Sequence, residues 1–205
     1  MCRTLRIGIA LTAALAAAMA PGCVPPKERE EQGVKEKAKK PVVVIETSMG
    51  TIKAELWPDK APRTVRNFLR YVEEEFYDGL IFHRVMPKFM IQGGGFRPGM
   101  TEKRTHGPIV NEARSDVPNE RGTLAMARTP DPHSATAQFF INLVDNDFLN
   151  HKDNTQAGFG YCAFGRVVEG MDVVDEIAKV QTRTVGQHEH VPLKPVVIRS
   201  IRPAE

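Results

Sequence analysis

Short apolar and β-branched runs of strand length dominate the chain from residue 41 onward. The run at 42–45 is followed by turn residues at 48–50 and by a second run at 51–57, which predicts a β-hairpin. Further runs of this kind occupy 80–85, 88–92, 122–127, 138–143, 160–168 and 195–201, with loops rich in Gly, Pro, Asn and Asp between them. The pattern predicts a mainly β domain.

Two segments have the longer spacing of helices instead. Between residues 59 and 75, Val65, Phe68, Leu69 and Val72 recur at helical spacing, Asp59 is placed to cap the helix, and a proline at 62 suits its first turn. A second, shorter helix is predicted at 171–179. Because closure of a sheet removes its exposed edges, these elements favour a closed antiparallel β-barrel of about eight strands, with the two helices capping its ends.

The first residues have a different character. Arg3 and Arg6 precede an uncharged run at 7–20 that is rich in Ala and Leu, which is typical of a secretory signal peptide and is shorter than the roughly 20 apolar residues of a membrane span. The run ends at Gly22-Cys23, which resembles a bacterial lipobox, although Pro21 departs from the usual pattern. We therefore expect a signal peptide at 1–22, export to the cell envelope or periplasm, and a lipid on Cys23 that anchors the protein to a membrane. Cleavage after Ala20 without lipidation is the alternative.

Charge and composition define the remaining organisation. Residues 24–40 contain two prolines, no aromatic residue and a dense mixture of Lys and Glu, so residues 23–40 are predicted to be the lipidated cysteine and a charged flexible linker. Residues 41–205 then form one folded domain.

The net charge is only +3, and basic and acidic residues are interleaved along the chain. This distribution argues against a nucleic-acid partner.

Three segments have a pattern that suggests a binding pocket: FHRVMPKFMIQGG at 82–94, MAR at 126–128 and QFFI at 138–141. Alternate side chains on a strand share a face, so Gln138, Phe140 and Asn142 should point one way, while Phe139, Ile141 and Leu143 enter the core. By the same rule Met90 shares a face with Gln92, and Phe82 with Arg84. The prediction is an apolar pocket with one arginine and two glutamines at its margin.

Together these segments resemble the cyclophilin family, and the resemblance extends over residues 41–203, including NDFLN at 146–150 and YCAFG at 161–165. It implies a cyclophilin-like barrel and peptidyl-prolyl cis/trans isomerase activity on proline-containing polypeptides, which would assist the folding of exported proteins. It implies no cofactor, and we expect a monomer. A proline-peptide binding module or holdase without catalysis is the alternative function.

The resemblance also implies roles for individual residues. Arg84 is the catalytic residue, and Gln92 positions its guanidinium. The implied substrate-binding residues are Phe89, Met90, Ala127, Arg128, Gln138, Phe140, Phe148, Leu149 and Tyr161. Arg128 stands where Asn is frequent in the family, and Phe148 where many eukaryotic members have Trp.

Histidines offer two further candidates for chemistry. His83 is next to Arg84, but strand alternation directs it to the opposite face, so we expect a structural histidine and not a base. His188, Glu189 and His190 could chelate a metal, but we expect them in a loop before the last strand, without a third and fourth ligand. No metal site is predicted.

Overall fold

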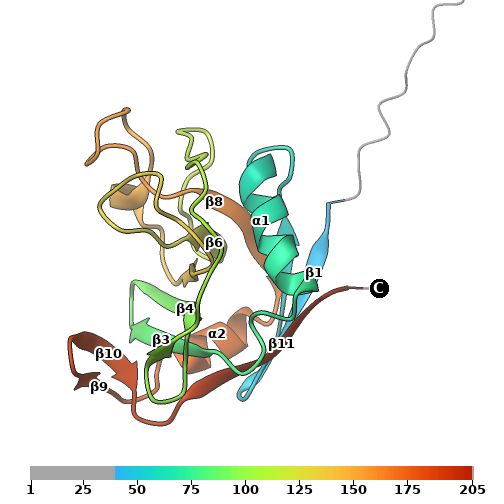
Figure 1. Ribbon diagram of the computed structural model, residues 1–205, viewed down its shortest axis with the longest axis vertical. Coiled ribbons are helices and arrows are strands. Elements are labelled where there is room, and N and C mark those ends of the chain that lie inside the picture. Colours follow the sequence, from blue (N-terminus) through green and yellow to red (C-terminus); the bar gives the residue numbers. More distant parts are fainter. Residues whose placement is uncertain (1–39, 205) are drawn as a thin grey trace, which may run out of the picture. The chain divides into compact units, whose positions relative to one another are not determined.

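A computed structural model of the protein defines residues 40–204 (Figure 1). The predicted signal peptide, Cys23 and nearly all of the predicted linker lie outside the described residues. Within the described part of the chain, no helix is long and apolar enough to cross a membrane.

Eight strands close into an antiparallel barrel, as predicted. Their order is β3-β11-β1-β2-β8-β6-β7-β4, and pairing of β3 with β4 completes the circle. The barrel strands are β1 (Val42–Thr47), β2 (Gly50–Leu56), β3 (Ile81–Met86), β4 (Met90–Arg97), β6 (Thr123–Met126), β7 (Phe139–Asn142), β8 (Ala163–Glu169) and β11 (Val196–Pro203). The two-residue strand β5 (Thr101–Glu102) extends the sheet beyond β4. The fold class and the first hairpin are confirmed.

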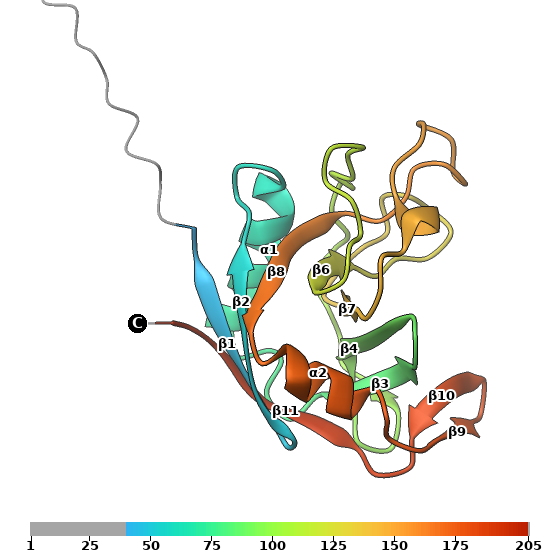
Figure 2. The ribbon, with the colours of Figure 1, turned by 180° about the vertical axis from the view of Figure 1, so that it is seen from behind.

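Two helices, α1 (Pro62–Glu73) and α2 (Met171–Ile177), lie at opposite ends of the barrel (Figures 1 and 2). The start of α1 differs from the expectation, because Ala61 is the N-cap and Asp59 does not cap the helix. The carboxylate of Glu112 takes that role: it accepts hydrogen bonds from the backbone N–H groups of Arg63 and Thr64 at 3.2 and 2.8 Å. A negative charge at this end also suits the helix dipole. The cap is therefore supplied from 48 residues away along the chain.

Aromatic side chains fill the interior of the barrel. The ring of Phe68 on α1 lies 5.5 Å from that of Phe139 and 5.2 Å from that of Phe164. The buried Tyr77 hydroxyl donates to the carbonyl of Ala137 at 2.9 Å, so its polar atom is satisfied. Such interlocked rings make the interior a packed core, and the substrate site must lie on the outside of the barrel.

A second hairpin, which the sequence analysis missed, stands beside the barrel. Strands β9 (Thr182–Val185) and β10 (His188–Pro192) pair with each other in a separate two-stranded sheet. The expected loop at 188–190 is therefore wrong: these residues belong to β10. Only two of the nine strand residues of this hairpin are buried, so it has few apolar positions, which explains why it gave no strand pattern.

Candidate active site

Arg84 and Gln92 face each other across two neighbouring strands. Arg84 on β3 is directly opposite Gln92 on β4 in the antiparallel register. The register is irregular on both sides of Phe82. This irregularity turns Phe82 into the core, where its ring lies 6.1 Å from that of Phe139. The expectation that Phe82 shares a face with Arg84 is thus wrong, because a bulge interrupts the alternation.

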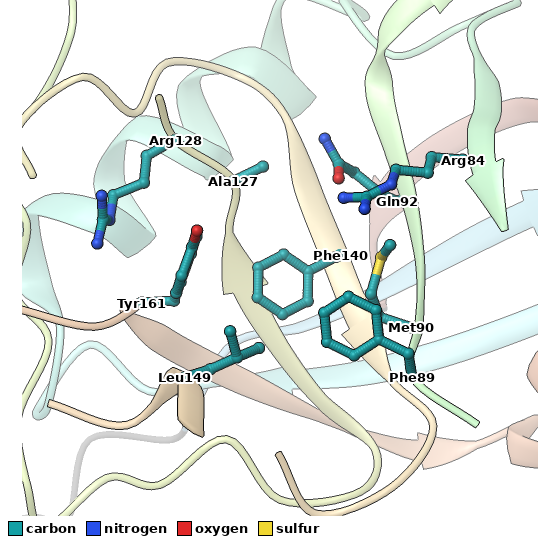
Figure 3. Close-up of a pocket in the computed structure, with 9 residues that line it drawn as sticks. All are labelled: Arg84, Phe89, Met90, Gln92, Ala127, Arg128, Phe140, Leu149 and Tyr161. Atoms are coloured by element: carbon teal, nitrogen blue, oxygen red, sulfur yellow. The ribbon is translucent and has the colours of Figure 1, made fainter. Parts of the chain in front are cut away.

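A cavity of about 160 Å³ opens in front of this pair (Figure 3). Strands, turns and a short 3-10 helix (Asp147–Leu149) each contribute side chains to it. The lining residues are Arg84, Phe89, Met90, Gln92, Ala127, Arg128, Phe140, Leu149 and Tyr161. All of them were predicted as site residues, so the structure gathers segments that are far apart in the sequence around one hollow.

The floor of the cavity comes from the outward face of β7. Phe140 lies here, and its ring meets that of Tyr161 edge-on at a centroid distance of 5.7 Å. Its neighbours Phe139 and Ile141 belong to the barrel core, as the alternation predicted. Phe140 packs instead in a separate apolar cluster with Met90 and Leu149.

Two predicted residues lie beside the cavity without lining it. Gln138 accepts a hydrogen bond from the Gln92 side-chain amide at 3.0 Å. Phe148 is 65% exposed, and its ring lies 5.5 Å from that of Phe89 at the rim. Both positions leave the side chains accessible to a peptide that extends beyond the cavity.

The guanidinium of Arg84 has free donors. Within the described residues Arg84 forms no ion pair and no side-chain hydrogen bond, and Gln92, which we expected to hold it, donates to Gln138 instead. The two side chains only lie next to each other (Figure 3). Several N–H groups of Arg84 therefore point at the cavity without a protein acceptor.

Arg128, on the opposite side of the cavity, is held by the protein through three hydrogen bonds. Its Nε donates to the carbonyl of Gly160 at 3.0 Å, and one terminal nitrogen donates to the carbonyls of Thr129 and Pro130 at 2.9 and 3.1 Å. The guanidinium also lies 4.5 Å from the centre of the Tyr161 ring, a cation–π distance. Arg128 thus fastens two loops at the edge of the cavity.

The charges around the cavity favour electron-rich groups. The two arginines are the charged residues that line it, and no carboxylate is among the lining residues. His83 is 95% buried and is not one of them. Burial, together with the nearby His188 and Arg84, lowers the pKa of His83 to about 4. The ring is therefore neutral at neutral pH and supplies no proton in that range.

Three buried asparagines behind the cavity were missed by the sequence analysis. Asn119 donates to the carbonyls of Leu149 and Tyr161 at 3.2 and 3.1 Å. Asn146 donates to the carbonyl of Phe89 at 3.1 Å and to the side chain of Asn142 at 2.7 Å. The network therefore fixes the backbone of three lining residues. Of the three, only Asn142 was placed from the sequence, on the same face as Gln138 and Phe140, and its side chain is completely buried.

Comparison with known proteins links this site to one family. Residues 42–202 match the family model described as "Cyclophilin type peptidyl-prolyl cis-trans isomerase/CLD". The chain is 56% identical over 164 residues to "Peptidyl-prolyl cis-trans isomerase B" of Escherichia coli, which covers 80% of this chain and 100% of that protein. It is 55% identical over 161 residues to a "Peptidyl-prolyl cis-trans isomerase" of Acinetobacter baylyi, with 78% and 84% covered.

Solved structures of cyclophilin type isomerases have the same fold. A crystal structure of a Cryptosporidium parvum cyclophilin type peptidyl-prolyl cis-trans isomerase superposes with a TM-score of 0.68 at 25% identity, covering 81% of this chain and 98% of that chain. The same protein crystallised in the presence of the dipeptide Ala-Pro gives a TM-score of 0.67 at 26% identity, with 80% and 99% covered.

Proposed function

The chain belongs to the cyclophilin-type peptidyl-prolyl cis-trans isomerase family and isomerises Xaa-Pro bonds, and we propose that Arg84 carries the catalysis in the cavity that it lines. The obstacle to rotation is amide resonance, which gives a barrier of about 18–20 kcal/mol. In the twisted state this resonance is lost, and the proline nitrogen gains a lone pair that can accept a hydrogen bond. A donor aimed at that nitrogen stabilises the twisted state more than either planar isomer, and so accelerates rotation.

The free guanidinium of Arg84 is the observation that carries this proposal. It is half-buried at the margin of an apolar cavity, and none of its N–H groups is committed to another described residue. A guanidinium stays charged throughout the physiological pH range, so no titration switches it off. In the apolar surroundings of Met90 and Phe140 such a donor interacts more strongly with an acceptor than it would in water.

The rest of the cavity suits the remainder of the substrate. Phe89, Met90, Phe140 and Leu149 form an apolar hollow of the size required for a proline ring. Crystallisation of the Cryptosporidium relative in the presence of Ala-Pro supports a proline-containing ligand.

The peptide before the proline has polar partners next to this hollow. The N–H of Ala127 is already used by the carbonyl of Gln138 at 2.9 Å. We therefore assign the carbonyl of Ala127, the N–H of Arg128 and the amide of Gln138 to the peptide that precedes the proline. Phe148 and Tyr161 form the apolar rim.

An isomerisation assay on a proline tetrapeptide tests the role of Arg84 and separates catalysis from mere binding. Arg84→Ala should lose turnover while the protein still binds the peptide, because the apolar hollow is intact. Gln92→Ala should have a smaller effect, because Gln92 has no hydrogen bond to Arg84. Equal turnover in the wild type and Arg84→Ala would remove Arg84 from the mechanism.

We also propose that the protein is exported and carries lipid on Cys23. The support is the sequence of the first 23 residues, with its two arginines, uncharged run and Gly-Cys end. Cys23→Ser should release the protein from the membrane fraction or leave it unprocessed. Unchanged fractionation of this variant would favour secretion without a lipid.

The clients that fit this location are other exported proteins, whose Xaa-Pro bonds exchange over tens to hundreds of seconds without a catalyst. We propose that the protein accelerates this folding step as a monomer, since one chain supplies every side chain of the cavity. Refolding of a secreted protein limited by proline isomerisation should be accelerated by the wild type and not by Arg84→Ala. Equal acceleration by both would instead indicate the holdase alternative.

A further inference from the structure

A second cavity, of about 420 Å³, lies next to the first. Both cavities are lined by Arg84 and Gln92, which stand between them. The other side chains around the second cavity are His83, Phe96, Gln138, Gln187, His188 and Glu189. Ala127 and Arg128, at the opposite edge of the proline cavity, do not line it.

The outer wall of this cavity is the β9–β10 hairpin. Strand β10 runs beside β3, the strand that carries Arg84 (Figures 1 and 2). His188 pairs with Val185, but Val191 pairs with Arg183, so β10 has one extra residue between these two pairs. His190 lies within this bulge and has a φ of 60°, an unfavourable angle for a residue other than glycine.

The bulge has a visible consequence for the cavity. His188 and Glu189 are consecutive on β10, and regular alternation would direct them to opposite faces. Both nevertheless line the cavity. β-bulges redirect side chains in this way and are frequent next to active sites.

The chemistry of the wall is complementary to a long cationic side chain. Glu189 is the carboxylate among the lining residues; it is exposed and has no ion-pair partner among residues 40–204. The ring of Phe96 lies between those of His83 and His188, at centroid distances of 4.6 and 5.0 Å. Phe96 and His83 are buried, so the exposed ring of His188, supported from behind by Phe96, is the part that can cover the aliphatic stem of a lysine or arginine while the charged end reaches Glu189.

The position of the cavity indicates which part of a peptide reaches it. Along the barrel the strand order is β3, β4, β7 and β6, with Arg84 on β3 at one end and Ala127 directly after β6 at the other. The peptide before the proline is assigned above to Ala127, Arg128 and Gln138, and of these three only Gln138, which is hydrogen-bonded to Gln92, also lines the second cavity. The chain that leaves the proline on its carboxyl side therefore passes Arg84 towards β10.

We propose that this second cavity is a substrate subsite that takes a lysine or arginine side chain on the carboxyl side of the proline and pairs its charge with Glu189. The proposal depends on the proposed function in one respect: the assignment of the peptide before the proline sets the direction in which the substrate lies. It adds a residue that determines substrate preference and lies outside the proline cavity.

The test is kcat/KM on short proline peptides with Lys, Gln or Glu at each of the first three positions after the proline and alanine elsewhere. The wild type should prefer Lys over Gln at one of these positions by about two- to fivefold, the range of a solvent-exposed ion pair, and added salt should reduce the preference. Glu189→Gln should abolish the preference, and Glu189→Lys should shift it towards Glu. Glu73→Gln removes an exposed charge on α1, far from the cavity, and should keep the wild-type preference.

Three results would overturn the subsite. The first is equal kcat/KM for Lys and Gln peptides in the wild type, and the second is a Lys preference that survives Glu189→Gln. The third is a Glu189-dependent preference found only for residues before the proline. The all-alanine peptide separates this failure from that of the proposed mechanism, because Arg84→Ala should lose turnover on it and the control Glu73→Gln should not.

Discussion

The two edges of the proline cavity each present an arginine, but the protein treats the two side chains in opposite ways (Figure 3). Arg128 donates to three backbone carbonyls and stacks on Tyr161, so its position is fixed by the surrounding loops. Arg84 has no such partner among the described residues and is placed only by its strand and by its neighbour Gln92.

This difference gives Arg128 a structural role and leaves Arg84 available for catalysis. A guanidinium that donates three hydrogen bonds to backbone carbonyls contributes to the stability of the loops and is held in place by them. A guanidinium with free donors at the edge of an apolar hollow is available for a lone pair that appears only in the transition state. Charge alone does not distinguish the two residues; their hydrogen-bond partners do.

The largest expected effect is at the Arg84 edge. Arg84→Ala should lower kcat/KM by about 10²–10³, the loss typical of removing one transition-state donor. Its free energy of unfolding should change by less than about 0.5 kcal/mol, since no hydrogen bond within the protein is lost. Peptide isomerisation and urea unfolding measure the two quantities. A stability loss as large as the catalytic loss would show that Arg84 is structural, like Arg128.

The next effect concerns pH and involves His83, the buried neighbour of Arg84. The pKa of His83 is about 4 in the folded protein and about 6.5 in an unfolded chain, so below pH 6.5 only the unfolded state takes up the proton. Stability is therefore complete above pH 6.5 and decreases towards pH 4, by on the order of 2–3 kcal/mol. Acid titration of the unfolding free energy should show this slope, and His83→Asn should remove it.

Catalysis should not follow that titration. Turnover between pH 6 and 8 should stay nearly constant, because the mechanism needs no proton transfer and the His83 ring is already neutral in this range. A rate that titrates like a histidine in this range would contradict a mechanism that depends on Arg84 alone.

The smallest effect is expected at the Arg128 edge. Arg128→Ala should cost about 1–2 kcal/mol of stability through the loss of its carbonyl contacts. KM should rise severalfold with kcat largely kept, because the edge of the cavity loosens while Arg84 is untouched. Separate measurement of kcat and KM, with urea unfolding, tests this. A loss confined to kcat would place Arg128 in the chemistry.

The sequence predicted features that depend on local periodicity. Alternation on β7 separated Phe140 from Phe139 correctly because that strand is regular. It failed at Phe82, where a bulge in the pairing of β3 with β4 interrupts the alternation. The capping of α1 by Glu112 and the carbonyl contacts of Asn119 join residues far apart in the chain, so no local pattern reveals them.

The site shows the same division. The family resemblance identified the residues that line the cavity. It did not predict their hydrogen bonds, because Gln92 donates to Gln138 and not to Arg84. The polar β9–β10 hairpin has almost no apolar alternation, so the second cavity was invisible in the sequence.

The most direct test of the central claim is the interconversion rate of cis and trans peptide while it is bound, measured by NMR exchange at saturating enzyme. Arg84→Ala should reduce this rate by about a hundredfold or more, while the dissociation constant of the peptide changes by less than about tenfold. An unchanged interconversion rate in Arg84→Ala, with or without weaker binding, would contradict the account.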